Sequence, residues 1–274
     1  MIHTIYMPED KGKSYTEIVY PAGEVQIRFT EEQANAVEQA DAVRLIARCD
    51  IMRIGLMADC LYHVMAGQQP VTLVLPYLNY SRADRRFTTS DCFGLHVYAK
   101  MLNAITFDKV ITVDAHSSVA KRHINNFTNI SVDALIKNAI DYFKQTLTVL
   151  LPDEGSLGRY HFPPGTIVKH CTKKRDAKTG TLSGFDVPHI HTDHALIVDD
   201  ICDGGGTFRG IAKKAKEMCF GRNELSLFVT HGIFSKGLDI ILDDFEHVFT
   251  TNTIQRDWLS PHLTEYSFES LLEG

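Results

Sequence analysis

The sequence predicts an α/β protein of two domains, each with a mainly parallel sheet flanked by helices. Short β-branched runs alternate with helical patterns along the chain, which is the arrangement that parallel strands and their crossover helices produce. The 274 residues suit two compact α/β domains or one large one. With 44% apolar and 23% charged residues, the chain has the composition of an ordinary globular protein that can bury a sizeable core.

Each expected element follows from its local pattern. Apolar, β-branched runs predict strands at Ala42–Ala47, Val71–Leu75, Lys109–Val113, Leu147–Leu151, Thr166–Lys169, Ala195–Val198, Leu225–Val229 and His247–Thr250. Apolar residues at helical spacing predict helices at Ile51–Met65, Asp91–Leu102, Val132–Phe143 and Thr207–Glu217. The alternation in Glu24–Phe29 predicts a hairpin that precedes the wound part of the fold.

Two polar stretches organise the chain. Lys121–Ser131 is the best place to divide it, which gives an N-terminal domain of residues 1–130 and a C-terminal domain of residues 131–254. Cys171–Val187 is rich in charge, Gly and Thr without an apolar period, so it is predicted as a long mobile loop of functional importance.

Composition and charge exclude several classes of protein. The net charge is −6 and no concentrated basic cluster exists to displace counterions from phosphates, so nucleic-acid binding is not expected. The six cysteines form no CxxC pair, which favours a reducing compartment without a structural metal. Charges in Met1–Lys13 exclude a signal peptide, and apolar runs such as Val71–Leu75 are too short to cross a membrane. A cytoplasmic protein is expected.

The strongest motif is the segment Ala195–Thr207. A buried strand ends in Asp199 and Asp200, and Gly204–Gly206 then precede an amphipathic helix. Glycines let the backbone fold closely around an anion, with its N–H groups and the helix N-terminus facing inward. Carboxylates suit ribose hydroxyls and an amide nest suits a phosphate, so one loop could hold both ends of a ribose phosphate. A Gly-rich turn with an acidic helix cap explains the adjacent aspartates less well.

This motif resembles the PRPP loop that type I phosphoribosyltransferases share with ribose-phosphate pyrophosphokinases. Further segments, in family order over nearly the whole chain, resemble the pyrophosphokinases. They are Gly23-Glu24, Tyr80–Arg86, Val113–His116, Pro152–Gly155 with Arg159, Lys173–Arg175, Thr230–Gly232 and Thr251–Ile254. The resemblance implies two phosphoribosyltransferase-type domains with the active site between them, and residues 255–274 returning to the N-terminal domain.

The resemblance also implies an enzyme that moves the β,γ-diphosphate of ATP to the anomeric hydroxyl of a ribose phosphate and releases AMP. Lys173 and Arg175 would be catalytic cations that close over the attacked β-phosphate. The ribose phosphate would be bound by Asp199, Asp200, Asp203, Gly204, Gly205, Gly206 and Thr207. ATP would be bound by Tyr20, Glu24, Arg82 and His116, with Mg²⁺ held by His116 and Asp153. Taken singly, His116 is equally well explained as a hydrogen-bonded structural histidine, and Lys173 and Arg175 as a solvated run of charge on a loop.

One departure from the family bears on the acceptor. The family's loop usually carries threonine where Gly204 stands, so a hydroxyl that would grip a terminal phosphate is lost and space is gained. This favours an extended 5-phosphate as in ADP-ribose, the substrate of divergent phage-type relatives that serve NAD salvage. Ribose 5-phosphate, the acceptor for PRPP and nucleotide biosynthesis, and ADP-ribose are predicted equally.

Two other functions compete with this prediction. A type I phosphoribosyltransferase that consumes PRPP explains the Asp199–Thr207 loop but leaves His116, Asp153 and Arg82 without a role. A non-catalytic regulatory homologue is expected to lose its loop cations or metal ligands, and all are present in this sequence. Family ATP sites borrow residues across a subunit interface, so the resemblance implies a homo-oligomer built from dimers, up to a hexamer.

Overall fold

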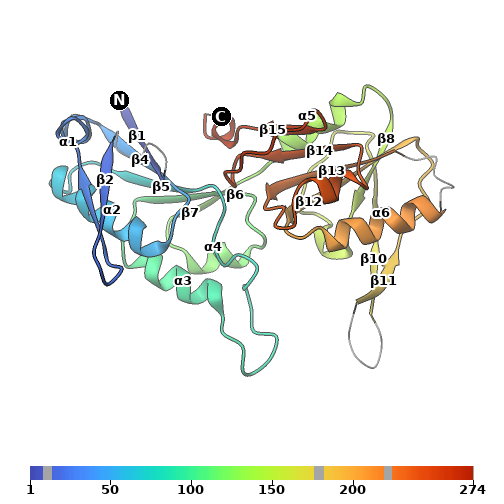
Figure 1. Ribbon diagram of the computed structural model, residues 1–274, viewed down its shortest axis with the longest axis horizontal. Helices are drawn as coiled ribbons and strands as arrows, with labels where there is room; N and C mark the ends of the chain where they lie inside the picture. Colours follow the sequence, from blue (N-terminus) through green and yellow to red (C-terminus); the bar gives the residue numbers. More distant parts are fainter. Residues whose placement is uncertain (9–13, 176–181, 219–223, 274) are drawn as a thin grey trace. The chain divides into compact units, whose positions relative to one another are not determined.

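The chain forms two compact units, Met1–Ile130 and Ser131–Gly274, in a computed structural model (Figure 1). The structure describes residues 1–8, 14–175, 182–218 and 224–273. Each unit contains its own parallel sheet with helices along it. The prediction of an α/β protein with mainly parallel sheets flanked by helices is confirmed.

The sheet of the first unit has the order β1-β4-β5-β6-β7, and every neighbouring pair is parallel. Its strands are β1 (Ile2–Met7), β4 (Ala42–Ala47), β5 (Val71–Leu75), β6 (Lys109–Val113) and β7 (Phe127–Ile130). Its helices are α1 (Glu31–Glu38), α2 (Ile51–Val64), α3 (Gly94–Asn103) and α4 (Val119–His123). The side chain of Asp50 starts α2 by accepting hydrogen bonds from the N–H groups of Met52 and Arg53.

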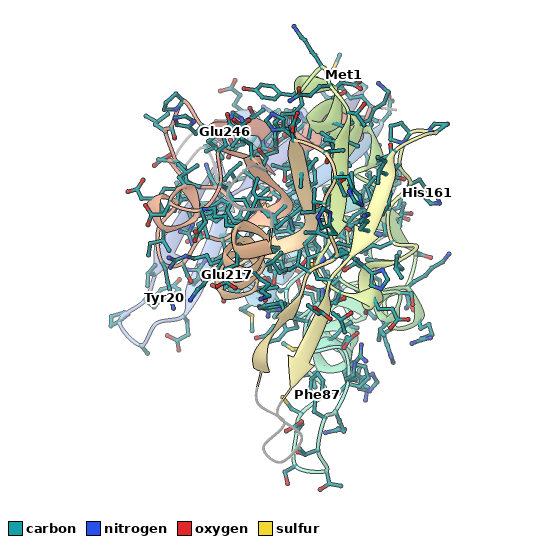
Figure 2. The ribbon with its side chains drawn as sticks, turned by 90° about the vertical axis from the view of Figure 1, so that its right-hand side faces the viewer. Met1, Tyr20, Phe87, His161, Glu217 and Glu246 are labelled. Carbon is teal, nitrogen blue, oxygen red and sulfur yellow. The ribbon has the colours of Figure 1, made fainter. Side chains whose placement is uncertain are left out.

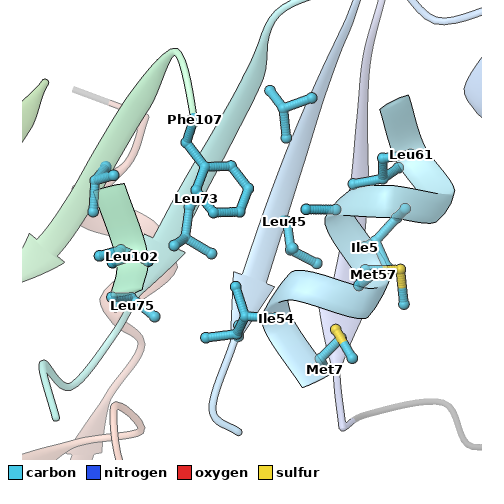
Figure 3. Close-up of a cluster of buried hydrophobic side chains, with 14 of the residues drawn as sticks. Ile5, Met7, Leu45, Ile54, Met57, Leu61, Leu73, Leu75, Leu102 and Phe107 are labelled. Atoms are coloured by element: carbon cyan, nitrogen blue, oxygen red, sulfur yellow. The ribbon is translucent and has the colours of Figure 1, made fainter. Parts of the chain in front are cut away.

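The core of this unit lies between the sheet and its helices (Figure 3). Leu45 of β4 and Leu73 of β5 face Ile54, Met57 and Leu61 of α2, and all five side chains are fully buried. Burying each such side chain contributes about 1.5–3 kcal/mol. This packing holds the strands in register and so fixes where their carboxyl ends lie.

An antiparallel hairpin of β2 (Tyr15–Val19) and β3 (Val25–Phe29) belongs to the same unit. The predicted hairpin at Glu24–Phe29 is therefore confirmed. Ile27 of β3 is buried in the core beside α2, which anchors the base of the hairpin. Its turn contains Gly23 with φ of +95°, a left-handed conformation that favours glycine.

The sheet of the second unit has the order β15-β14-β13-β12-β8-β9 and is also parallel throughout. Its strands are β8 (Leu147–Leu151), β9 (Ile167–His170), β12 (His194–Cys202), β13 (Glu224–Gly232), β14 (His247–Thr251) and β15 (Leu263–Tyr266). Its helices are α5 (Asp133–Tyr142), α6 (Gly206–Met218) and α7 (Asp239–Leu242), with 3₁₀ turns at Glu154–Ser156 and Phe268–Leu271.

The segment predicted as a long mobile loop is partly a second hairpin, so that prediction was wrong for much of its length. β10 (Thr172–Arg175) pairs antiparallel with β11 (Leu182–Asp186), and residues 176–181 lie outside the described part of the chain. The hairpin projects from the second unit (Figure 1). At the base of the hairpin, Cys171 and Phe185 are buried against the domain.

Residues 255–274 belong to the second unit, whereas the resemblance implied that they return to the first. β15 pairs with β14, and the ring of Tyr266 stacks on that of Phe249 at 6.3 Å between centroids. Asn252 accepts a hydrogen bond from the N–H of Phe268 at 2.8 Å, and Phe268 is fully buried. Strand pairing and burial therefore hold this segment on the second sheet.

Across the described residues, no helix has both the length and the apolar character needed for a membrane crossing.

Candidate functional site

The predicted acidic pair lies on β12, near the middle of the second sheet. β12 pairs with β8 only as far as Ile197, but with β13 as far as Cys202. Asp199 and Asp200 therefore stand past the end of the β8 pairing, at the carboxyl edge of the sheet. Ligands of open parallel sheets bind at this edge.

Both carboxylates of the pair are held in a largely buried setting. Asp200 is 3% exposed, and its Oδ1 lies 3.2 Å from Nη1 of Arg159. The N–H of Asp200 donates a hydrogen bond to Oδ1 of Asp199 at 2.9 Å. Burial and, second, the charge of Asp200 raise the pKa of Asp199 well above its ordinary value, although Arg159 opposes the shift. The pair thus presents carboxyl oxygens at the edge of the sheet that could accept hydrogen bonds from hydroxyl groups of a ligand.

The glycine loop leads directly into α6. Gly205 has φ of +73°, and a Cβ there would lie 2.2 Å from Cδ1 of Ile241, so both its backbone and its packing require glycine. α6 begins at Gly206, and the first N–H groups of a helix lack partners within the helix. Thr207 is half-buried and Asp203 is exposed. The start of α6 combines amide groups that have no partner within the helix with the positive end of the helix dipole, which suits an anion.

Gly204 lies under the side chain of Lys236. A Cβ at Gly204 would lie 3.2 Å from Cε and 3.4 Å from Cδ of Lys236. The extra space expected beside Gly204 is therefore partly filled by the side chain of Lys236.

The hairpin with the predicted catalytic cations starts close to α6. Lys173 of β10 pairs with Phe185 of β11, and Arg175 pairs with Leu182. A Cβ at Gly210 of α6 would lie 2.5 Å from Cε2 of Phe185, so the hairpin base packs tightly on the helix that follows the glycine loop. Only the backbone of Lys173 and Arg175 is described. The structure places both residues in the same unit as the acidic pair and the glycine loop.

Asp153 follows β8, the strand beside β12. Its Oδ1 accepts a hydrogen bond from Oγ of Ser156 at 3.4 Å, and a Cβ at Gly155 would lie only 3.1 Å from the same oxygen. Burial and, to a lesser extent, the charge of Asp153 raise the pKa of Cys171 to about 12, so this buried thiol is not a reactive group. A carboxylate oxygen is the kind of ligand that Mg²⁺ prefers, so Asp153 fits that ion. His116 is an imidazole, a poorer ligand for Mg²⁺, and it belongs to the first unit.

In the first unit, two segments predicted separately to bind ATP lie together. Asp84 is 3% exposed and its Oδ1 lies 2.8 Å from Nε of Arg85. The hydrogen bond from Arg85 lowers the pKa of Asp84, and a bond from Ser117 and the charge of His116 act in the same direction. The segment after β5 therefore meets the segment after β6 at the carboxyl edge of this sheet. Arg82 is exposed and His116 is half-buried.

Tyr20 and Glu24 form the two ends of the turn between β2 and β3. The N–H of Tyr20 donates to the carbonyl of Glu24 at 2.8 Å, and Tyr20 is 48% exposed. Tyr20 lies at the tip of its hairpin (Figure 2). Both side chains are available to a molecule that approaches this tip, and the structure does not bring them to the segments that contain Arg82 and His116.

Sequence reasoning gave no role to Arg159 or Asp84, although both lie in segments that it singled out. What distinguishes these two residues is that their charges lie in buried or half-buried positions, and a sequence motif does not show burial. A third group that it missed could hold a metal ion: one ligand atom each of His194, Glu224 and Glu246 lie within 4.8 Å of one another. Nε2 of His194 is 2.8 Å from Oε2 of Glu224. This group stands at the amino ends of three strands, about 17 Å along β12 from the acidic pair.

Comparison with known proteins agrees with the motifs, although the sequence matches no protein-family model. A ribose-phosphate pyrophosphokinase from Pyrococcus abyssi is 28% identical over 256 residues, which cover 90% of this chain and 86% of the relative. A ribose-phosphate pyrophosphokinase from Mycoplasmopsis pulmonis is 27% identical over 237 residues, which cover 82% and 71%. The crystal structure of a phosphoribosylpyrophosphate synthetase from Mycobacterium smegmatis matches with a TM-score of 0.76 at 20% identity, over 99% of this chain and 96% of that one.

The fold is thus that of a phosphoribosylpyrophosphate synthetase, with two phosphoribosyltransferase-type domains. The chain is a homologue of the ribose-phosphate pyrophosphokinases, a group of transferases, over most of its length.

Proposed function

We propose that this chain is a pyrophosphokinase that moves the β,γ-diphosphate of ATP to the anomeric hydroxyl of a ribose phosphate and releases AMP. The observation that supports it most is the edge of β12, where a buried acidic pair is followed by a glycine loop and a helix N-terminus. These are the groups needed to bind a diol and a phosphate on one sugar. The names of the homologues support the same reaction.

In this proposal the acceptor is bound along the loop. Asp199 and Asp200 accept hydrogen bonds from sugar hydroxyls, and the guanidinium of Arg159 holds the Asp200 carboxylate in place for that purpose. Asp203, Gly204 and the amide groups of Gly205–Thr207 surround the phosphate. Because both ends of the sugar are fixed, the anomeric hydroxyl is held in line with the bond that breaks in ATP.

ATP is assigned to the segments of the first unit. Arg82 contacts the phosphates and His116 lies beside them. Tyr20 stacks near the adenine, and Glu24 faces the adenine from a neighbouring subunit of a homo-oligomer. Asp153 and His116 would hold Mg²⁺, with Asp153 as the better-suited ligand, and the ion would neutralise charge on the triphosphate. Lys173 and Arg175, on the first strand of the hairpin whose base packs on α6, stabilise negative charge that develops at the β-phosphate.

Ribose 5-phosphate is the acceptor that the names of the relatives favour. ADP-ribose remains the alternative, because Gly204 removes the side chain that would enclose a terminal phosphate. AMP release from ATP and Mg²⁺ with each acceptor separately decides between them. If neither acceptor is turned over, the chain is either a type I phosphoribosyltransferase or a non-catalytic regulatory homologue. Incubation with PRPP, in the presence and in the absence of a nucleobase, would distinguish these two functions.

Asp199→Asn tests the role of the acidic pair. We expect kcat/KM for the acceptor to fall about 10- to 100-fold, because a hydrogen bond to a charged group contributes about 1.5–3 kcal/mol. The same change should raise the free energy of unfolding at neutral pH. An acid whose pKa is raised on folding destabilises the folded state as pH rises through that pKa, and asparagine removes this cost.

AMP release and urea unfolding of the same preparations provide the two measurements. Asp193→Asn is the control, since Asp193 is an exposed carboxylate just before β12, at the opposite end of the strand. Normal turnover by Asp199→Asn would remove the acidic pair from the acceptor site.

A further inference from the structure

Backbone hydrogen bonds of the residues around Lys236 hold its segment against the glycine loop. The N–H groups of Ile233 and Phe234 donate to the carbonyl of Cys202 at 2.9 and 3.1 Å, and that of Ser235 donates to the carbonyl of Asp203 at 3.2 Å. The residue after Lys236, Gly237, has φ of +95°, and its N–H donates to the carbonyl of Phe234 at 2.8 Å. The turn after β13 is therefore tied along the start of the glycine loop.

The side chain of Lys236 crosses over the loop at Gly204. Its Cε and Cδ lie 3.2 and 3.4 Å from where a Cβ at Gly204 would be, which is closer than side chains normally pack. A threonine or serine at this position would push the lysine away. The observed position of the Lys236 side chain therefore depends on the absence of a side chain at position 204.

The ammonium group of Lys236 has no anionic partner within the described part of the chain. Two cations of α6, by contrast, have a carboxylate partner: Nε of Arg209 lies 2.9 Å from Oδ2 of Asp244, and Nζ of Lys216 lies 3.3 Å from Oδ1 of the same residue. Lys236 is exposed, so its charge is available to a ligand. A lysine acts as a flexible point charge that attracts phosphate without demanding one geometry.

We infer that Lys236 binds the phosphate end of the acceptor and that Gly204 is side-chain-free so that this lysine can reach it. The inference rests on the proposed function, because it takes the glycine loop as the acceptor site. A cation then replaces the neutral hydroxyl of a threonine, and the loop gains charge instead of empty space. The ligand class is a sugar carrying a phosphate or diphosphate at this end, since a point charge serves either group.

Lys236→Ala tests the inference by calorimetric binding of ribose 5-phosphate, ADP-ribose and inorganic phosphate in turn. We expect the Kd of the sugar phosphate that the chain binds to rise about 10- to 100-fold, with ATP binding unchanged. Lys236→Arg should recover most of the affinity, because it restores the charge. The affinity of the unsubstituted chain should fall with salt more steeply than that of Lys236→Ala. If Lys236→Ala loses more affinity for ADP-ribose than for ribose 5-phosphate, the lysine binds a diphosphate. If it loses more affinity for ribose 5-phosphate, the lysine binds a terminal phosphate.

Lys213→Ala is the matched control, because Lys213 is an exposed lysine of α6 about two turns beyond the loop. Gly204→Ala should weaken acceptor binding about 3- to 10-fold by displacing Lys236, and it should cost little further in the Lys236→Ala background. Thermal unfolding of each variant verifies that it is folded.

The outcomes separate the inference from the proposed function. If the unsubstituted chain transfers diphosphate but Lys236→Ala binds the acceptor equally well, the inference is wrong and the function stands. If neither acceptor is turned over but Lys236→Ala loses sugar-phosphate binding, the function is wrong and the phosphate site stands. If the unsubstituted chain binds no phosphate ligand at all, both are overturned.

Discussion

Gly205→Ala is expected to lower the free energy of unfolding by about 2–5 kcal/mol and to abolish measurable acceptor binding. A non-glycine residue at φ of +73° costs about 1–2 kcal/mol, and forcing a Cβ to within 2.2 Å of Cδ1 of Ile241 adds an overpacking cost of about 1–3 kcal/mol. Ile241 is 1% exposed and cannot simply move into solvent. The loop must therefore shift, and its amide groups shift with it.

Urea unfolding and calorimetry measure the two effects. Gly206→Ala is the stability control, because a Cβ there meets nothing within 4 Å and the residue begins α6. That change should alter stability by less than about 1 kcal/mol. Adding Ile241→Val to Gly205→Ala removes Cδ1 itself, so the double variant should be more stable than the sum of the single changes indicates. Full stability of Gly205→Ala would contradict the described packing.

Arg159→Leu is expected to lower the free energy of unfolding by about 3–5 kcal/mol, because it leaves Asp200 buried without its cation. The loss should be smaller at acidic pH. The pKa of Asp199 is already raised, and removing Arg159 takes away the charge that opposes the shift, so the two carboxylates destabilise the folded state increasingly as pH rises. Acid conditions neutralise the pair and relieve the repulsion.

Urea unfolding of Arg159→Leu at mildly acidic and mildly alkaline pH measures this dependence. Arg209→Leu is the control: its partner Asp244 lies at 2.9 Å, but the Arg209 side chain is 45% exposed. An exposed pair contributes about 0–1 kcal/mol, so this variant should lose little stability at either pH. Equal losses from both variants would show that the Arg159–Asp200 pair is not the buried interaction described above.

The sequence predicts the inner strands well because a strand that is buried on both faces consists almost entirely of apolar residues. Val71–Leu75 and Leu147–Leu151 are apolar apart from one threonine each, and they form β5 and β8 within the bounds expected. The edge strands Ile2–Met7, Phe127–Ile130 and Leu263–Tyr266 were missed because they are only partly buried and mix polar with apolar residues. Their pairing depends on the neighbouring strand more than on their own pattern.

Some residues of the candidate site can be predicted from the sequence and others cannot. Asp199 and the glycine loop are predictable because strand, carboxylates, glycines and helix follow one another directly in the sequence. The contacts of Arg159 with Asp200 and of Lys236 with Gly204 join residues that are far apart along the chain. No local pattern encodes such contacts, so they emerge only from the way that the strands are ordered in the sheet.

Phosphorus NMR of the product formed from ATP, Mg²⁺ and ribose 5-phosphate tests the central claim most directly, with ADP-ribose as the second acceptor. The account predicts a new diphosphate signal on the anomeric carbon of one of these acceptors, with AMP formed in equal amount. Free pyrophosphate with AMP, ADP with phosphate, or no reaction with either acceptor would contradict diphosphate transfer by this chain.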